Sequence, residues 1–380
     1  MKTLLPLLLV LAALPVAGQS TSSQHSSMRP TRQSATHQKE RLGTVSFSVS
    51  CAPSTQASFN RGVALLHDFW YEESQPQFER ILKRDPTCAM AHWGIAMSLF
   101  HQIWDRPNPA AMELGWAQMQ SAQSPAAHTA RERAYIAALA DFYRPGPEPY
   151  QARIDAYSTA MGALYARYPK DVDAGAFYAL SLLASEAPGD TSLSHNRKAM
   201  AVLTPLFARH PDNPGVVHYI IHSCDNPAMA AEGLAAANHY GEIAQSGPHA
   251  FHMPGHIYAR LGMWPQDIAA QLGSIKASQV AEAHGESGIL DEPHSYDFLI
   301  YAYLQSGQDA RAKAALDRSA GVLTTIASMS GNGAGYMAGM IPYYRVKLAG
   351  FYELGMYDWK AAAALEPVAG SPPEDAALVY

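Results

Sequence analysis

The sequence contains little charge and no cluster of positive charge. Of its 380 residues only 16% are Asp, Glu, Lys or Arg, and the formal net charge is −6 at pH 7. Proteins that bind DNA or RNA need clustered Lys and Arg side chains to displace counterions from phosphates, and the sequence has no such run. We therefore expect no nucleic-acid partner. The hydrophobic fraction of 48% is enough to build a substantial core.

Long apolar runs are also missing after the first residues of the chain. Lys2 precedes an apolar run over residues 4–16, and two small residues follow it. A transmembrane helix needs about twenty apolar residues, whereas this shorter run is typical of a cleavable secretory signal. We expect a signal peptide at residues 1–18, export to the periplasm or the extracellular medium, and no transmembrane segment after cleavage. The polar residues 19–42 predict a disordered tether.

Cysteine is scarce, with only three residues in the chain. In an exported protein three cysteines allow one disulfide and leave one thiol. Cys51 and Cys88 flank the first predicted pair of helices, whereas Cys224 lies inside a later helix. We predict a disulfide between Cys51 and Cys88 and a buried free thiol at Cys224. The alternative is that all three cysteines pack as small hydrophobic residues.

Sequence motifs of common enzyme classes are absent. The chain has no G-x-S-x-G elbow, P-loop or dinucleotide fingerprint, and the segment HYIIH lacks the glutamate of the zinc-protease motif HExxH. The Gly-rich segment Gly331–Met340 lacks the strand and lysine context of a phosphate cradle, and whether it forms a lid stays open. The sequence therefore favours a binding protein over an enzyme. Catalysis stays open only through an unrecognised metal site.

Helical periodicity takes the place of strand signals. Apolar residues recur at three- and four-residue spacing, alanine is abundant, and turn segments such as YPKD and HPDNP fall at intervals. This pattern predicts an all-α protein. Comparison of the chain with itself shows helix-turn-helix units with a period near 34 residues. We expect about seven units, which form an α-solenoid over residues 43–370, followed by a C-terminal tail at residues 371–380.

The first unit has the clearest sequence signature. Gly62 lets two helices approach, Tyr71 lies at the turn between them, Ser74 is a small contact residue, and Pro86 ends the second helix. This pattern resembles the tetratricopeptide repeat (TPR) family. The resemblance implies a right-handed solenoid whose concave groove binds a protein or peptide partner, or a small ligand. The segments SVSCAPSTQ, DPTCAMAHWGIAMS and HAFHMPGHIYARLGMW are also similar to a group of secreted bacterial TPR proteins, which implies no particular reaction.

Several of the sixteen histidines recur in register with the repeat. His218 and His222 occupy positions five and nine of one unit, and His252 and His256 occupy the same positions 34 residues later. In the TPR family, positions two, five and nine of the first helix line the concave groove. The resemblance therefore implies one shared inner surface. The residues expected to line this ligand groove are His218, His222, His249, His252, His256, His294, Asp297 and Tyr301.

These histidines support two interpretations. Residues four apart on a helix lie about 5–6 Å apart, so each i, i+4 histidine pair could chelate a metal ion. The expected metal ligands are His218, His222, His252 and His256. Asp225 or Asp297 could add a carboxylate or orient a ring. The ion would be a divalent transition metal such as zinc, copper or iron. The other interpretation is a polar groove that binds acidic peptides or carboxylates without metal.

We take an exported TPR scaffold that binds a partner in its histidine-rich groove as the primary hypothesis for function. A metal-binding protein or metal-dependent enzyme built on the His218, His222, His252 and His256 cluster is the alternative. Both hypotheses place the function on the same face of the solenoid. They differ in whether the imidazoles of that face retain a metal ion.

Overall fold

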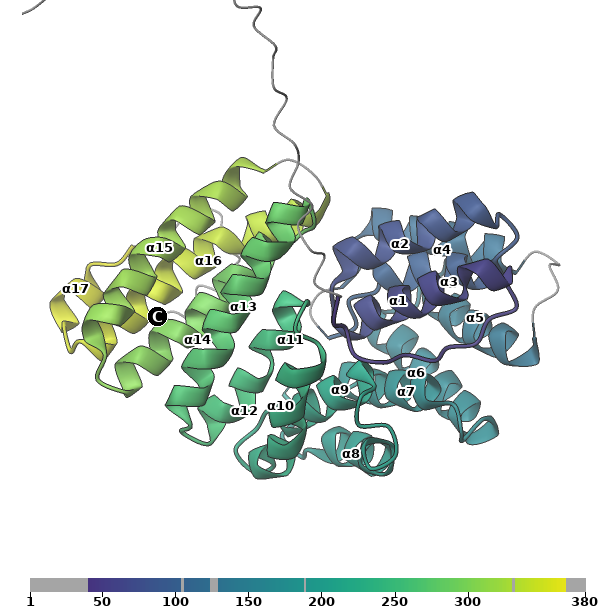
Figure 1. Ribbon diagram of the computed structural model, residues 1–380, viewed down its shortest axis with the longest axis horizontal. Helices are drawn as coiled ribbons and strands as arrows, with labels where there is room; N and C mark the ends of the chain where they lie inside the picture. The colour runs from purple at the N-terminus through teal and green to yellow at the C-terminus, as the bar shows by residue number, and fades with distance from the viewer. Residues whose placement is uncertain (1–39, 104–105, 124–128, 188, 330–331, 367–380) are drawn as a thin grey trace, which may run out of the picture. The chain divides into compact units, whose positions relative to one another are not determined.

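The computed structural model describes residues 40–103, 106–123, 129–187, 189–329 and 332–366. The predicted signal peptide, the first 21 residues of the predicted tether (19–39) and the predicted C-terminal tail lie outside this part of the chain. Within it the protein folds into seventeen α-helices and two short 3-10 helices, with no strand (Figure 1). The all-α prediction is therefore confirmed. None of the helices in these ranges is long and apolar enough to cross a membrane.

Successive helices pack against one another as pairs (Figure 1). The 3-10 helices are η1 (Pro53–Thr55), before α1, and η2 (Ile289–Asp291), before α14. The pairs are α1 (Gln56–His67) with α2 (Tyr71–Arg84), α3 (Ala89–Ser98) with α4 (Pro109–Ala122), α5 (Ala130–Tyr143) with α6 (Tyr150–Arg167), α7 (Val172–Ala184) with α8 (Ser194–Phe207), α9 (Pro214–Cys224) with α10 (Ala230–Ile243), α11 (Pro248–His252) and α12 (Pro254–Arg260) with α13 (Trp264–His284), α14 (Glu292–Gln305) with α15 (Asp309–Ser328), and α16 (Asn332–Gly355) with α17 (Trp359–Ala363). The described chain thus contains eight pairs, one more than the approximate count predicted from the sequence.

The contact between the first two pairs shows why small residues recur in the repeat. A Cβ atom on Gly62 would lie 2.7 Å from the Phe78 ring, and one on Gly94 would lie 2.4 Å from it. The buried Phe78 ring therefore packs between two helices that only glycine allows to approach. The Ser74 hydroxyl donates to the Gly62 carbonyl at 3.1 Å, which ties the two helices of the first pair. The solenoid prediction is confirmed by this neighbour-to-neighbour packing.

The predicted tether ends three residues too late. Leu42 is 5% exposed, and the backbone N–H of Arg41 donates to the Ser246 hydroxyl at 2.9 Å. Glu40 forms an ion pair with Arg61 of α1, with a 2.7 Å N–O distance. Residues 40–42 therefore belong to the folded array. Their polar composition predicted disorder because sequence composition does not show the one buried leucine and the long-range contacts that hold these residues in place.

An extended segment, residues 43–50, follows and runs across several helix pairs; we call it the N-terminal segment. Its side chains alternate, with Val45 and Phe47 buried and Thr44, Ser46 and Ser48 exposed. The Phe47 ring packs against aromatic rings of α1, α3 and α5 at centroid distances of 5.0–5.5 Å. The segment thus ties together helices that are distant in sequence.

The structure confirms the cysteine prediction and shows that most of the Gly-rich segment is helical. Cys51 and Cys88 form the expected disulfide, with an S–S distance of 2.02 Å, and Cys224 is a buried free thiol. The Gly-rich segment predicted to precede the last unit is helical from Asn332 onward, as the first turns of α16. Its residues from Asn332 to Met340 are therefore not a loop that forms a lid, and Gly331 lies outside the described residues.

Candidate metal centre

Three neighbouring helical segments bring six histidines together. Each segment begins with a proline in its first turn, at Pro214, Pro248 and Pro293, which starts the helices in a similar register. The six rings form two groups of three, and within each group the candidate ligand atoms lie within 4.8 Å of one another. The first histidine triad is His218, His222 and His249, and the second histidine triad is His252, His256 and His294.

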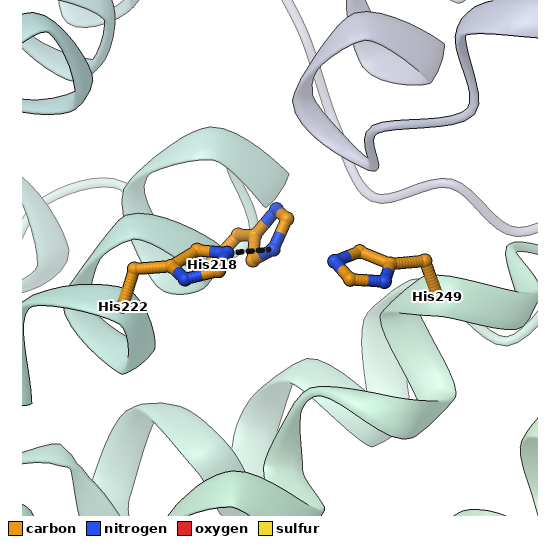
Figure 2. A group of neighbouring side chains, drawn as sticks. All are labelled: His218, His222 and His249. Atoms are coloured by element: carbon orange, nitrogen blue, oxygen red, sulfur yellow. Dashed lines mark hydrogen bonds between the residues drawn. The ribbon is translucent and has the colours of Figure 1, made fainter. Parts of the chain in front are cut away.

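In the first histidine triad, two rings from α9 face a third from α11 (Figure 2). The His218 Nδ1 lies 2.6 Å from the backbone carbonyl oxygen of His67. A carbonyl oxygen only accepts hydrogen bonds, so Nδ1 carries the proton and Nε2 of His218 carries a lone pair. That Nε2 lies 3.0 Å from Nε2 of His222. The Nε2 atoms of the two rings therefore point toward each other.

The first histidine triad is held in its neutral form. Burial, followed by the nearby His222, keeps the pKa of His218 well below its usual range. Burial, followed by the neighbouring His256, lowers the pKa of His222 to about 3, and burial also lowers the pKa of His249. Neutral imidazole is the form that binds a metal ion. The triad is therefore ready to act as a ligand set at neutral pH.

The turn between α1 and α2 closes over the first histidine triad. Phe69 has a left-handed backbone conformation, with φ of 56°, and its ring is buried. The ring centroid lies 4.4 Å from His218, 5.5 Å from His222 and 5.6 Å from His249. The adjacent Asp68 accepts a 2.7 Å hydrogen bond from the Tyr240 hydroxyl of α10, which anchors the turn. The first unit of the array therefore covers histidines contributed by the fifth and sixth units.

The second histidine triad has a more extensive set of hydrogen-bond partners. His252 Nδ1 lies 2.6 Å from the side-chain oxygen of Gln271. The side-chain nitrogen of Gln271 in turn donates a 2.8 Å hydrogen bond to Asp267. His256 Nδ1 lies 2.8 Å from a carboxylate oxygen of Asp225. Both rings thus donate through Nδ1, so in the neutral form of each ring Nε2 carries the lone pair. These two Nε2 atoms face each other at 2.8 Å.

His294 completes the second histidine triad at a more accessible position. Its side chain is 38% exposed and that of His256 is 12% exposed, whereas His252 is buried. Burial, followed by the neighbouring His256, lowers the pKa of His294 to about 3, and burial lowers that of His252 well below its usual range. Solvent therefore reaches the second triad from the side of His294, in contrast to the first triad beneath Phe69.

The other predicted groove residues lie beside the triads or apart from them. Asp297 is buried, forms an ion pair with Lys347, and lies 3.9 Å from His294 Nδ1 through one carboxylate oxygen. Tyr301 is 40% exposed and packs against Trp264 and Phe351 rather than against a histidine ring. Four of the eight predicted groove residues are buried, namely His218, His249, His252 and Asp297. The eight residues therefore do not form one open surface.

The metal ligands predicted from the sequence were the two i, i+4 pairs, with Asp225 or Asp297 adding a carboxylate or orienting a ring; Asp225 does contact His256. The structure places His249 beside the first pair and His294 beside the second. The repeat register already carried a signal for both, because each is at position two of its unit. The hydrogen-bond partners Gln271 and Asp267 lie on α13, and no sequence pattern connects them with the histidines. His67, whose carbonyl orients His218, is separated from it by 151 residues.

Comparisons with known proteins assign no family and no activity. No family model and no curated protein match the sequence. Among solved structures, the crystal structure of the P58(IPK) TPR domain is similar over 86% of this chain and 97% of that chain, with 11% sequence identity and a TM-score of 0.22. The paired helices and their glycine-mediated packing define the class, which is an all-α, TPR-like helical repeat protein.

Proposed function

We propose that this protein binds two transition-metal ions, one in each histidine triad. Imidazole nitrogen is a good ligand for zinc, copper and iron, and three histidines form a common metal site. Both ligand sets are buried or partly buried and come from helices of consecutive repeats. The proposal follows the alternative that the sequence left open, and the geometry of the second triad is the observation that favours it.

The two facing nitrogens of His252 and His256 carry the proposal. With both Nδ1 atoms donating to oxygen acceptors, the two Nε2 lone pairs meet at 2.8 Å. Two lone pairs at this distance repel unless a proton or a metal ion lies between them. Tetrahedral zinc places two imidazole nitrogens about 3.3 Å apart, given Zn–N distances of about 2.0–2.1 Å. A small rotation of the two rings therefore creates a chelate.

The partners of the second triad also suit a cation. Metal-binding histidines commonly donate their other ring nitrogen to a carboxylate or an amide oxygen, which fixes the ring and raises its basicity. Asp225 does this for His256, and Gln271 backed by Asp267 does it for His252. Asp225 also pairs with Arg260 at 2.8 Å, which holds the carboxylate in place. These contacts explain why the rings hold one orientation.

The two sites have different surroundings and therefore different expected roles. Phe69 covers the first triad, which supplies three ligands as the second does, and this cover slows the exchange of a bound ion. The second triad is exposed at His294, and three protein ligands leave a coordination position for water or a small ligand. We propose that the second ion exchanges faster than the first.

The histidine positions also bear on the partner-binding hypothesis. Helical repeat arrays generally present extended surfaces to protein partners, and this architecture supports an interaction scaffold as the general class. A peptide that lay along the predicted groove would meet buried rings at His218, His249 and His252. Their burial favours an ion over a peptide at this position. The Cys51–Cys88 disulfide supports the proposal that the protein works in an oxidising, exported compartment.

Elemental analysis tests the proposed metal sites directly. Protein purified without chelator and without a metal-affinity column should contain about two equivalents of transition metal, one for each triad. The His222→Ala/His256→Ala variant should contain none and should keep its helical circular dichroism. The matched control is His92→Ala/His239→Ala, which removes two histidines outside both triads. Equal metal in both variants, or none in the wild type after incubation with zinc, copper and iron, would overturn the proposal.

The carboxylate behind His256 gives a second prediction. Asp225→Asn should weaken metal binding at the second site by about 10- to 100-fold, the range typical of lost outer partners, because the ring loses its anionic acceptor. The measurement is competition with a chromophoric chelator in a His222→Ala background, which removes the first site. Asp212→Asn is the control, since Asp212 pairs with His239 outside both triads. An unchanged affinity in Asp225→Asn would show that Asp225 does not support a metal ligand.

A further inference from the structure

A second candidate site lies at a cavity that shares no residue with the histidine triads. The cavity has a volume of about 870 Å³. Its wall consists of the N-terminal segment, the turn between α6 and α7, and the turn between α8 and α9. Binding sites for small molecules commonly have volumes of about 300–1,000 Å³, so the cavity has the size of a ligand site.

One wall of the cavity is a row of hydroxyl groups. The sequence Thr44-Val45-Ser46-Phe47-Ser48 alternates between polar and apolar residues, as an extended chain with one buried face requires. Val45 and Phe47 are buried, and Thr44, Ser46 and Ser48 line the cavity. The buried Phe47 ring contacts Phe59, Trp93 and Tyr135, which holds this segment in place. The hydroxyl row is therefore presented by a fixed backbone.

Positive charge also lines the cavity, at repeated positions of the sequence. Arg167 begins the sequence RYPKD at the end of α6, and Arg209 begins the sequence RHPDN after α8. These two arginines occupy equivalent positions in consecutive repeats, and both line the cavity together with Lys170. Arg167, Lys170 and Arg209 are exposed.

The carboxylates of the same cavity are occupied by other partners. Asp171 forms an ion pair with Arg131 and caps α7. Asp173 is buried and bonds to His67 and Asn213. Asp212 pairs with His239 at 2.9 Å. The lining holds four cations, Arg131, Arg167, Lys170 and Arg209, against these three carboxylates, which gives a net charge of +1 (4 − 3). Among the described residues only Arg131 is paired with one of the carboxylates, so Arg167, Lys170 and Arg209 remain available to an anionic ligand.

We propose that this cavity binds a small organic polyanion, a molecule with two or more carboxylate, sulfate or phosphate groups. The two arginines and the lysine contact the anionic groups, and arginine can do so with two parallel hydrogen bonds. The row of hydroxyls donates to the remaining oxygens. The regular spacing of the arginines along consecutive repeats favours a ligand with several separated charges over a single small anion.

Isothermal titration calorimetry at low salt, on metal-free protein, tests this site separately from the metal sites. Citrate and inorganic tripolyphosphate are the probes, and at least one should bind once per chain with a Kd of about 10–100 μM. Arg167→Ala/Arg209→Ala should weaken that binding by about tenfold or more, because each lost contact is a charge-assisted hydrogen bond.

The first repeat supplies a matched control. Arg84 precedes Pro86 as Arg167 precedes Pro169 and Arg209 precedes Pro211, but it does not line the cavity. Lys83→Ala/Arg84→Ala removes the same charge and should change the Kd by less than about twofold, the effect expected for distant screened charges. No binding of either probe up to about 1 mM, or equal weakening in the two double variants, would overturn the proposed site.

Discussion

Replacing His67 with alanine should destabilise the protein by about 3–5 kcal/mol, the cost of breaking a buried polar network. The His67 side chain is fully buried, with Nδ1 2.9 Å from the Tyr219 hydroxyl and Nε2 3.1 Å from an Asp173 carboxylate oxygen. The ring also stacks on Phe177 at a centroid distance of 4.5 Å. Without the imidazole, the buried Asp173 keeps only part of its hydrogen bonding. Chemical denaturation of the metal-free protein measures the loss.

This variant also separates a structural histidine from the metal ligands. The His67→Ala backbone still presents the carbonyl oxygen that accepts from His218, so the first histidine triad should keep its orientation and its metal. His239→Ala is the control, because its partly exposed side chain pairs only with surface carboxylates and should cost less than about 0.5 kcal/mol. A loss below about 1 kcal/mol in His67→Ala would show that its buried network contributes little.

The repeat architecture could be predicted because its cause is local. Gly62, Ser74 and Phe78 belong to one unit, and their spacing alone requires two helices in close contact. The start of α16 could not be predicted in the same way. Glycine lowers intrinsic helix propensity, so the segment from Asn332 resembles a loop in sequence, and packing against α14 and α15 overrides that preference.

The candidate site could be predicted only in part, for a geometric reason. The pairs His218 with His222 and His252 with His256 follow from helix periodicity within a single segment. The third ligand of each triad depends on how far apart neighbouring helices lie, and a sequence pattern does not contain that distance. The repeat register placed His249 and His294 on the same surface but did not select them as metal ligands.

The contact that closes the first triad was the least predictable feature. Phe69 lies about 150 residues before the histidines that it covers, and its positive φ is uncommon for a bulky side chain. An array of repeats predicted from local sequence leaves its concave face open. Here the first unit packs against the fifth and sixth units, since α1 contacts α9 and Asp68 bonds to Tyr240. The concave face is closed at this point, and the histidines of the first triad, which were predicted to line an open groove, are buried or partly buried.

Saturating metal should raise the free energy of unfolding by about 4 kcal/mol for each site at a free metal concentration a thousandfold above Kd. The reason is that each triad takes its histidines from two consecutive units. The first joins α9 to α11, and the second joins α11 and α12 to α14, so two ions link three consecutive units. An unfolded chain holds neither ligand set together, and binding energy therefore becomes folding energy. Thermal melts with zinc or copper, and again with excess chelator, measure the effect.

Single variants divide this stabilisation between the sites. His222→Ala should remove the contribution of the first triad and His256→Ala that of the second, while the double variant should melt at one temperature with and without metal. Metal bound at the first triad should also slow amide hydrogen exchange in the α1–α2 turn, because a bound cation strengthens the contact of the histidine rings with Phe69. If metal raised the melting temperature of the double variant as much as that of the wild type, the stabilising ions would bind elsewhere. If the wild type and all the variants melted at the same temperature with and without metal, metal ions would not connect the repeats.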